Sequence, residues 1–322
     1  MDHHLTRRTF LKTTTAGALA LGAELLSDDA EAAARPLPRR VLGKTGVRVP
    51  ILGFGTASCG IRRNVPNAVE LYNEAIDLGV NYMDTAPSNT GYGRAQVQLG
   101  HVLKDRRDDV FLVTKTHEAG GDAALRLLEK NLKELQTDHA DLVYVHSLGD
   151  LDLDTALGPR GVFAALMKAK REGLTRFVGV SGHHRPAKFL RALKAYDIDV
   201  LMCAVNFADR HTYNFEQKVF PVAAQKNVGL VAMKVYGGAN WSDKTMSNRM
   251  MPKEYLPAAF RYALSIPRVS LAVVGMATRE ELMQNLAWAR RFRPLSDAER
   301  QSLAPVGRKL AARWGAHFGP VG

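Results

Sequence analysis

A rhythm of short apolar runs and longer helical patterns repeats eight times between residues 51 and 289, and it constrains the fold more than any other feature. Each run is rich in β-branched or other apolar residues, and a segment with helical periodicity follows it. The runs are 51–57, 81–86, 110–115, 141–146, 176–181, 200–206, 229–234 and 271–275. The helical segments are near 66–78, 94–103, 122–135, 161–172, 186–195, 214–226, 253–265 and 279–289. This alternation indicates βαβ units, and eight of them predict a (β/α)8 barrel of the TIM type.

Two further elements flank the repeats. Residues 39–51, RRVLGKTGVRVPI, predict a β-hairpin that turns at Lys44-Thr45-Gly46, and a C-terminal helix is expected to begin at Ser296. An open, doubly wound sheet is the alternative fold. We disfavour it because no G-x-G-x-x-G motif follows a strand and opens a helix.

The first 34 residues have the features of an export signal. TRRTFLK at 6–12 resembles the address of the twin-arginine (Tat) pathway, and a weakly apolar stretch of about 14 residues follows it. That stretch is shorter than the roughly 20 residues of a spanning helix, and small residues at 30–34 fit a cleavage site. We therefore expect a signal peptide at 1–34, a barrel at 35–322, passage through the Tat translocase, and a periplasmic or other extracytoplasmic location.

Charge and cysteine content exclude several classes of protein. The formal net charge is +12, and residues 1–34 hold three basic and five acidic residues, so the remainder carries about +14. This charge favours anionic ligands, but the basic residues are dispersed and no nucleic-acid-binding motif accompanies them, so we expect no nucleic-acid partner. Two cysteines, Cys59 and Cys203, are too few for a four-cysteine iron–sulfur cluster. No stretch after residue 34 is long and apolar enough to predict a stable membrane span.

Polar side chains stand at the ends of consecutive predicted strands. Asp84, Lys115, His146 and Ser181 end the second to fifth strands, and Tyr92 follows Asp84 in the next loop. In a barrel the carboxyl ends of all strands share one face, and that face carries the active site. Each residue alone has an ordinary structural explanation, such as a turn or a satisfied core position, but their order on successive strands predicts one site.

From Leu42 to about Trp288, the sequence resembles the aldo-keto reductase family. The resemblance rests on LGKTGVRVPILGFGTA, NYMDTA, YGRAQVQLGHVL, VFLVTKT, DLVYVHS, GLTRFVGVSG, AVNFADR and VVGMATREELMQNL. It implies that Asp84, Tyr92, Lys115 and His146 are the catalytic set of a nicotinamide-dependent carbonyl reductase or alcohol dehydrogenase. Tyr92 would exchange a proton with the substrate oxygen, Lys115 would lower the pKa of Tyr92, Asp84 would hold Lys115, and His146 would orient the carbonyl.

The resemblance also implies where the cofactor lies. Its contacts would be Gly55, Thr56, Ser181, Gly182, Asn206, Met233, Lys234, Tyr236, Gly275, Thr278, Arg279, Glu281 and Asn285. NADP(H) is favoured by the habit of the family, but the family often has arginine in place of Glu281, so NAD(H) is a serious alternative. A carboxylate there would repel a 2′-phosphate, and Arg279 could bind one instead. No iron–sulfur cluster and no metal are expected.

The sequence departs from the family in several places. Tyrosine usually follows the aspartate by five residues, and here that position is Asn89, so we interpret Asn89-Thr90-Gly91 as an insertion ahead of Tyr92. If Asn89 took the slot, general-acid catalysis by this set would be in doubt. Among the expected carboxamide contacts, Gly182 stands in place of an asparagine and Met202 in place of a glutamine. Asn206 or His183 could compensate for them. Met233 stands where a tyrosine usually stacks on the nicotinamide.

Function therefore has one favoured interpretation and two alternatives. The favoured one is reduction of a small aldehyde or ketone, or oxidation of the corresponding alcohol. A catalytically idle nicotinamide-binding sensor or partner-binding subunit on the same fold is the alternative, which the altered carboxamide contacts support. A metal-dependent hydrolase is weaker, because His183 and His184 are adjacent and lack the spacing of a metal motif.

Overall fold

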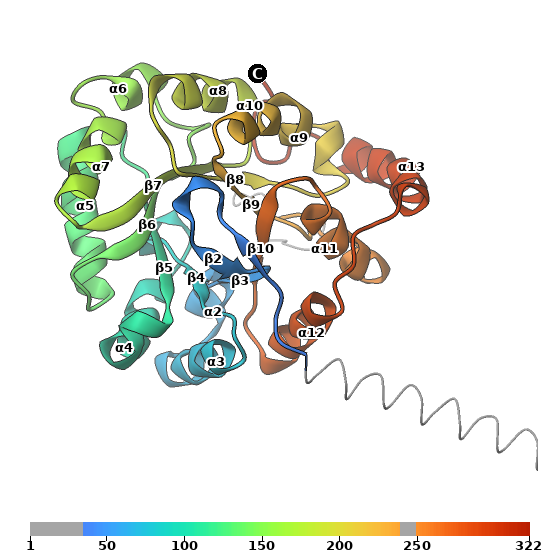
Figure 1. Cartoon of the computed structure of the whole chain (residues 1–322), viewed down its shortest axis with the longest axis horizontal. Helices are drawn as coiled ribbons and strands as arrows, with labels where there is room; N and C mark the ends of the chain where they lie inside the picture. The colour runs from blue at the N-terminus through green and yellow to red at the C-terminus, as the bar shows by residue number, and fades with distance from the viewer. Residues whose placement is uncertain (1–34, 239–248) are drawn as a thin grey trace, which may run out of the picture. The chain divides into compact units, whose positions relative to one another are not determined.

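Eight parallel strands close into a barrel in the computed structural model, which describes residues 35–238 and 249–322 (Figure 1). The order around the barrel is β10-β3-β4-β5-β6-β7-β8-β9. The strands are β3 (Leu52–Gly55), β4 (Tyr82–Asp84), β5 (Phe111–Thr116), β6 (Ala140–Val145), β7 (Thr175–Gly182), β8 (Val200–Ala204), β9 (Gly229–Met233) and β10 (Val269–Gly275). Gly55 of β3 pairs with Gly275 of β10 and closes the ring. The predicted (β/α)8 barrel is confirmed.

Helices form a layer outside the barrel, as Figure 1 shows. They are α2 (Ala57–Arg62), α3 (Val65–Asp77), α4 (Ala95–Arg106), α5 (Gly121–Glu134), α6 (Leu153–Leu157), α7 (Val162–Arg171), α8 (Pro186–Ala195), α9 (Phe215–Lys218), α10 (Phe220–Gln225), α11 (Leu256–Leu264), α12 (Arg279–Arg290) and α13 (Asp297–Trp314). Ser296 caps α13 with a capping box to Glu299, as expected. The helix expected over 214–226 is instead two short helices, α9 and α10. Pro221 has no backbone N–H with which to continue α9, and it stands in the first turn of α10, where proline is favoured.

Side chains alternate between two cores along the strands. Tyr82, Val113 and Tyr144 belong to the cluster inside the barrel, and Phe177 of β7 packs against it. Residues of opposite phase pack beneath the helices. Side chains on a strand repeat every two residues. The inward phase therefore continues from these residues to the ends of β4, β5, β6 and β7, which is where the candidate site lies.

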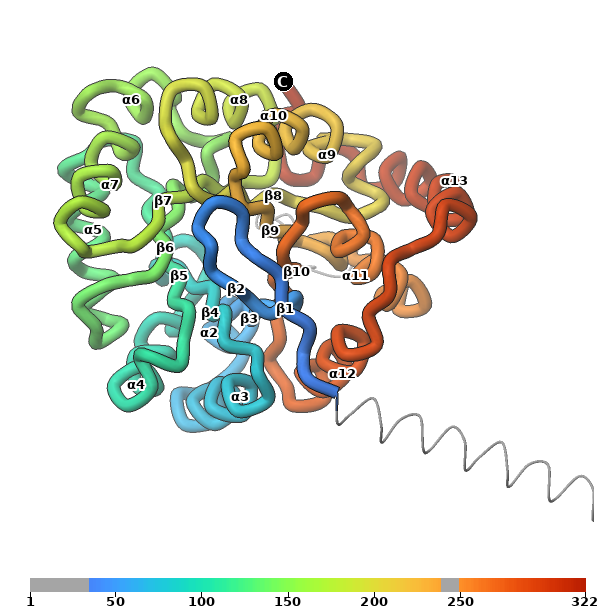
Figure 2. Tube along the Cα trace, viewed as in Figure 1, coloured from blue at the N-terminus to red at the C-terminus, as the bar shows by residue number. Residues whose placement is uncertain are grey.

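The predicted hairpin closes the amino-terminal end of the barrel. It comprises β1 (Arg39–Val41) and β2 (Arg48–Pro50), joined through the 3₁₀ turn η1 (Gly43–Thr45), and Figure 2 shows it running across the front of the view. Leu42 and Val49 are buried in the interior cluster, and the Lys44 amide donates to the Asn227 carbonyl at 2.6 Å, just before β9. Among the described residues, the hairpin therefore covers the amino-terminal end of the barrel, and the polar strand ends lie at the opposite, carboxyl end.

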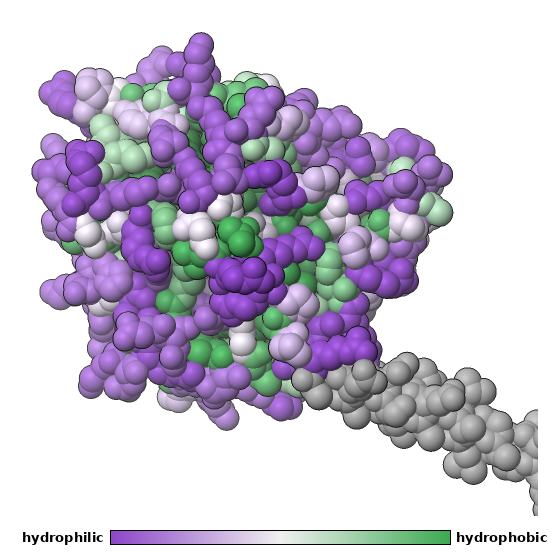
Figure 3. Space-filling model, in the orientation of Figure 1, coloured by the Kyte–Doolittle hydropathy of each residue, from purple (hydrophilic) through white to green (hydrophobic). Residues whose placement is uncertain are grey.

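Hydrophilic side chains cover most of the face seen in Figure 3, with smaller hydrophobic areas between them. Among the helices that the structure describes, none combines the length and apolarity that a bilayer span requires. The 1–34 segment of the predicted export signal lies outside the described residues.

Candidate functional site

A buried ion pair stands at the carboxyl end of the barrel. The Lys115 ammonium donates to Asp84 Oδ1 at 2.7 Å and to Oδ2 at 2.8 Å, and also to the Thr85 carbonyl at 2.8 Å. Lys115 is 1% exposed and Asp84 2%. Their neighbouring strands, β4 and β5, pair in parallel and put both side chains in the interior phase. The sequence predicted this pair correctly.

Tyr92 completes a triangle with these two residues. Its hydroxyl accepts from Lys115 Nζ at 3.1 Å and donates to Asp84 Oδ2 at 3.2 Å, and the ammonium lies 4.7 Å from the centre of its ring. Asn89 instead is exposed, with its amide nitrogen 3.3 Å from His117 Nε2. The structure thus brings Tyr92, rather than Asn89, to Lys115. We call Asp84, Tyr92 and Lys115 the buried cluster.

The loop before Tyr92 explains how this tyrosine reaches the cluster. Residues Ser88–Thr90 form a 3₁₀ turn, η2, that projects the inserted residues outward. On the other side α2 packs against the Tyr92 backbone at Gly60, where a Cβ atom would lie 2.0 Å from the Tyr92 carbonyl oxygen. The Arg94 amide donates to the Gly60 carbonyl at 3.1 Å. Helix α2, which the sequence did not predict, is therefore a wall of the tyrosine loop.

The pKa of Tyr92 is raised on balance, although the sequence suggested that Lys115 would bring it below its ordinary value. Burial, followed by the Asp84 carboxylate, raises the pKa of Tyr92 well above 10. The sequence suggested a cation beside the hydroxyl, but the structure places a carboxylate oxygen at nearly the same distance. Burial also raises the pKa of Asp84 and lowers that of Lys115, with each charge opposing the shift of the other. Tyr92 is therefore protonated at neutral pH, as a proton donor must be.

His146 lies beside the cluster, with its ring centre 6.3 Å from that of Tyr92. Burial, then the nearby Lys115, lowers the pKa of His146 well below 6.5, so the imidazole is neutral at pH 7. Its Nδ1 is buried and has no hydrogen-bond partner among the described residues. A neutral imidazole has one donor and one acceptor nitrogen, so His146 can donate one hydrogen bond to a ligand.

The predicted carboxamide contacts are present in part. Ser181 is in the interior phase of β7, and its Oγ is buried without a hydrogen-bond partner in the part of the chain that the structure describes. Gly182 has the opposite phase: a Cβ there would lie 2.8 Å from Cζ of the buried Phe189 of α8. Met202 and Met233 belong to the interior cluster. A buried hydroxyl and two thioethers thus stand at three of the positions where the sequence suggested contacts with the nicotinamide.

Other predicted cofactor contacts, which follow β8 and β9, already make hydrogen bonds within the protein. Asn206 donates to Asp209 Oδ2 at 2.6 Å and to the Lys234 carbonyl at 3.0 Å, and its Oδ1 accepts two backbone amides. It therefore lacks the free amide expected of a substitute carboxamide contact. Tyr236 donates to Asn285 Oδ1 at 2.5 Å, and Asn285 donates to the Glu281 carbonyl at 2.7 Å, so these residues link β9 to α12. Burial, then Lys115, lowers the pKa of Lys234 to about 8.

The segment between β10 and α12 is also arranged differently from expectation. Thr278 caps α12, accepting from the Glu281 amide at 3.1 Å. Arg279 turns away and pairs with Glu74 of α3 at 2.7 Å. Glu281 accepts from the Ala277 amide at 2.6 Å and pairs with Arg62 of α2 at 3.3 Å.

Three further predicted cofactor contacts pack against or hydrogen-bond to other parts of the protein: Gly55, Thr56 and Gly275. A Cβ at Gly55 would meet β10 at 3.3 Å, and one at Gly275 would meet Ser58 Oγ at 2.6 Å. The amide and hydroxyl of Thr56 each donate to the Asp84 carbonyl at 2.9 Å. Thr56 therefore fixes the strand end that carries Asp84.

Residues after α13 also reach the site, which the sequence did not indicate. Phe318 stacks on His183 with 5.0 Å between ring centres. His317 Nε2 lies 2.8 Å from Asp209 Oδ1, and its Nδ1 lies 3.1 Å from the Gly238 carbonyl. Phe318 therefore forms part of the rim beside β7. No pattern in the short segment after α13 distinguishes it from a frayed end.

Ligand sets for a metal are not assembled in residues 35–238 and 249–322, where no group of three His, Cys, Asp or Glu side chains is suitably placed. His183 stacks on Phe318, whereas His184 lies between Gly149 and Gly319. The two adjacent histidines therefore have different surroundings, and the hydrolase alternative gains no support.

Comparison with known proteins agrees with this geometry. The model of the aldo/keto reductase family matches residues 51–258. An uncharacterized oxidoreductase of Bacillus subtilis is 26% identical over 302 residues, covering 82% of this chain and 95% of the relative. L-Galactose dehydrogenase of Arabidopsis thaliana is 26% identical over 281 residues, covering 77% and 86%.

Two solved structures show the same arrangement. A Pseudomonas aeruginosa protein assigned to the aldo-keto reductases has a TM-score of 0.66 at 31% identity and covers 80% of this chain and 98% of its own. The holo form of an aldo-keto reductase from Bacillus halodurans has a TM-score of 0.67 at 25% identity, covering 88% and 100%.

Proposed function

Because this chain belongs to the aldo-keto reductase family, we propose that it reduces an aldehyde or ketone to an alcohol, or catalyses the reverse, with a nicotinamide cofactor. The observation that carries the proposal is the Tyr92 hydroxyl held between Lys115 Nζ and Asp84 Oδ2 at 3.1 and 3.2 Å. This hydroxyl is a proton donor at the carboxyl end of the barrel, beside a neutral imidazole.

A nicotinamide would fit the residues at the ends of β7 and β9. The unpartnered Ser181 hydroxyl suits an amide, and the Met233 thioether suits contact with a ring face. When bound, the nicotinamide supplies or accepts a hydride at its C4 atom. We favour NADP(H), with NAD(H) as the alternative.

The chain itself supplies proton transfer and orientation. Tyr92 would give its phenolic proton to the substrate oxygen, and the Lys115 ammonium would stabilise the phenolate that results. Asp84 would keep Lys115 in place through the two short contacts that it accepts. His146 would donate one hydrogen bond to the carbonyl oxygen and set its direction. In oxidation the proton would return to Tyr92.

The catalytically idle cofactor-binding subunit remains the second candidate, because Gly182 and Met202 offer no hydrogen bond to a carboxamide. Purified protein mixed with NADPH or NADH and a panel of small aldehydes and ketones separates the two. Carbonyl-dependent loss of the reduced cofactor is expected of the enzyme. Cofactor binding without such consumption would favour the idle subunit.

Tyr92→Phe is the specific test of the mechanism. Loss of the general acid should lower turnover by about 10²–10⁴, with little change in the Kd of the cofactor. Asn89→Ala is the matched control in the same loop and should retain turnover, because Asn89 points to His117. Equal turnover in Tyr92→Phe and wild type would remove Tyr92 from the mechanism.

We also propose that the Tat pathway exports the protein as residues 35–322, already folded around its cofactor, to the periplasm or an equivalent compartment. The support is the twin-arginine motif followed by a short apolar run. A cofactor bound before export would stabilise the fold by about 4 kcal/mol at a thousandfold excess over Kd. Replacing Arg7 and Arg8 by lysine should leave folded, active protein in the cytoplasmic fraction. Exported protein that carries no nucleotide and binds it weakly would refute the loaded state.

A further inference from the structure

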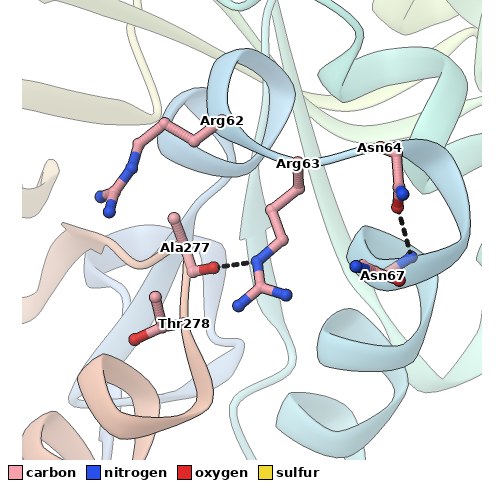
Figure 4. Close-up of a pocket in the computed structure, with 6 residues that line it drawn as sticks. All are labelled: Arg62, Arg63, Asn64, Asn67, Ala277 and Thr278. Carbon is pink, nitrogen blue, oxygen red and sulfur yellow. Dashed lines mark hydrogen bonds between the residues drawn. The ribbon is translucent and has the colours of Figure 1, made fainter.

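A pocket of about 350 Å³ lies between the end of α2 and the start of α12 (Figure 4). Its lining residues are Arg62, Arg63, Asn64, Asn67, Ala277 and Thr278. This lining contains two guanidinium groups and no carboxylate. Figure 4 shows Arg63, the residue after α2, reaching the Ala277 carbonyl, while Arg62 at the end of α2 extends along the other side of Ala277. We call this the α2 pocket.

The two arginines are placed in different ways. The Arg63 Nε donates to the Ala277 carbonyl, which directs its guanidinium along the pocket wall. Arg62 is more exposed and pairs with Glu281 Oε1 at 3.3 Å. The side chains of this pair are 57% and 39% exposed, so the pair contributes little stability and can exchange for a stronger anion.

The opposite wall is Ala277 and Thr278, which lead into the first turn of α12, a helix of 12 residues. Backbone N–H groups and the helix dipole make such a turn favourable for an anion. Arg279, the cation that the sequence suggested for this place, is bound to Glu74 on α3 instead. The guanidinium groups that line the pocket therefore come from α2.

We propose that Arg62 and Arg63 form the subsite for the 2′-phosphate at the adenosine end of the cofactor, so that α2 selects NADP(H) over NAD(H). This inference rests on the proposed function, which places a nicotinamide dinucleotide across the carboxyl end of the barrel. Two arginines can hold a phosphate dianion through several charge-assisted hydrogen bonds. Arg62 would exchange Glu281 for the phosphate, while Glu281 would keep its second oxygen on the Ala277 amide.

Isothermal titration with 2′,5′-ADP and with 5′-AMP tests the subsite without any turnover. Wild-type protein should bind 2′,5′-ADP more tightly. Arg63→Gln should raise the Kd of 2′,5′-ADP by about 10- to 100-fold, as expected for loss of a hydrogen bond to a charged group. The Arg62→Gln, Arg63→Gln double variant should abolish the preference for the 2′-phosphate. The Kd of 5′-AMP should stay unchanged.

Two controls and one further probe complete the design. Arg191→Gln removes an arginine of similar exposure, 60%, which pairs with Asp154 away from the pocket, and it should behave as wild type. Arg63→Lys keeps the charge and should recover part of the affinity. Inorganic phosphate should bind far more weakly than 2′,5′-ADP.

The outcomes separate this inference from the proposed function. An arginine-dependent preference for 2′,5′-ADP in a protein without carbonyl reductase activity would support the subsite and refute the enzyme. An unchanged preference in the double variant, a loss in Arg279→Gln instead, or phosphate binding as tight as that of 2′,5′-ADP would each overturn the subsite. So would failure of the wild type to bind either nucleotide.

Discussion

The buried cluster and the α2 pocket are two charged regions at the same end of the barrel, and they are built in opposite ways. In the buried cluster, Lys115 and Asp84 are almost fully buried and their charged atoms lie 2.7 Å apart. At the α2 pocket, Arg62 of the lining pairs with Glu281 outside it; both are partly exposed, and their charged atoms lie 3.3 Å apart. Helix α2 touches both regions, with Gly60 behind Tyr92 and Arg62 at the pocket.

This difference shows how burial divides the tasks of a site. A buried ion pair interacts strongly and loses much if one partner is removed, so it can hold a reacting group in one geometry. An exposed pair is weakened by solvent and salt, so it can open for a ligand. We therefore expect substitutions in the buried cluster to affect stability and turnover, and substitutions at the pocket to affect ligand choice.

Lys115→Met should have the largest effect. It leaves the Asp84 carboxylate buried without its cation, which costs about 3–5 kcal/mol of unfolding free energy, and turnover should fall by at least about 10²-fold. Urea denaturation and steady-state kinetics measure both. The Asp84→Asn, Lys115→Met double variant should recover much of the stability but none of the turnover. Lys130→Met, at an exposed pair with Glu134, is the control for losing a lysine.

Ser181→Ala should separate binding from stability. Its hydroxyl is buried and unpartnered among the described residues, so its removal should leave the stability of the free protein unchanged or slightly higher. Cofactor affinity should fall by about 3- to 10-fold, the value of one hydrogen bond. Thr85→Val removes another unpartnered buried hydroxyl, of the opposite strand phase, and should leave affinity intact. Equal cofactor affinity in both variants would place the carboxamide elsewhere.

Acid should lower the unfolding free energy through His146, which lies beside the buried cluster. The folded-state pKa of His146 lies well below 6.5, so below pH 6.5 the unfolded chain binds a proton that the folded chain excludes. Stability from this residue is complete above its unfolded pKa and is lost as pH falls toward its folded pKa, by about 1 kcal/mol between pH 6.5 and 5.5. Urea denaturation at several pH values in that range gives the unfolding free energy as a function of pH. This free energy should fall less steeply with acid in His146→Gln than in wild type. His101→Gln, at an exposed position, should retain the wild-type slope.

Arg279→Gln should have the smallest effect. Arg279 pairs with Glu74 at a side-chain exposure of 65%, and such pairs contribute about 0–1 kcal/mol. The ratio of the Kd values for NADP(H) and NAD(H) should change by less than about twofold. A tenfold change in this ratio would show that Arg279 of α12, rather than the arginines at α2, selects the cofactor. It would contradict the proposed difference between the two regions.

Much of the fold and of the buried cluster could be predicted from sequence because both follow strand periodicity. Strand phase puts Asp84, Lys115 and Ser181 inward. The resemblance of the segment YGRAQVQLG, downstream of the insertion, to the family identified Tyr92 rather than Asn89. The raised pKa of Tyr92 could not be predicted, because it depends on the burial of the hydroxyl and on a carboxylate oxygen 3.2 Å away. Helix α2 was missed because it has six residues, including Gly60, which is too short for a periodic pattern. Arg62 and Arg63 were missed with it.

The packing around Gly182 limits which substitutions this position can accept. An asparagine there would require Phe189 to move, since a Cβ would lie 2.8 Å from its ring. Phe189 is fully buried and packs edge to face on Phe215 at 5.0 Å, so a smaller residue at 189 leaves a cavity that costs about 3–5 kcal/mol. Either change made first is harmful, and the pair is epistatic. Single substitutions made one at a time would therefore not easily introduce an asparagine at position 182.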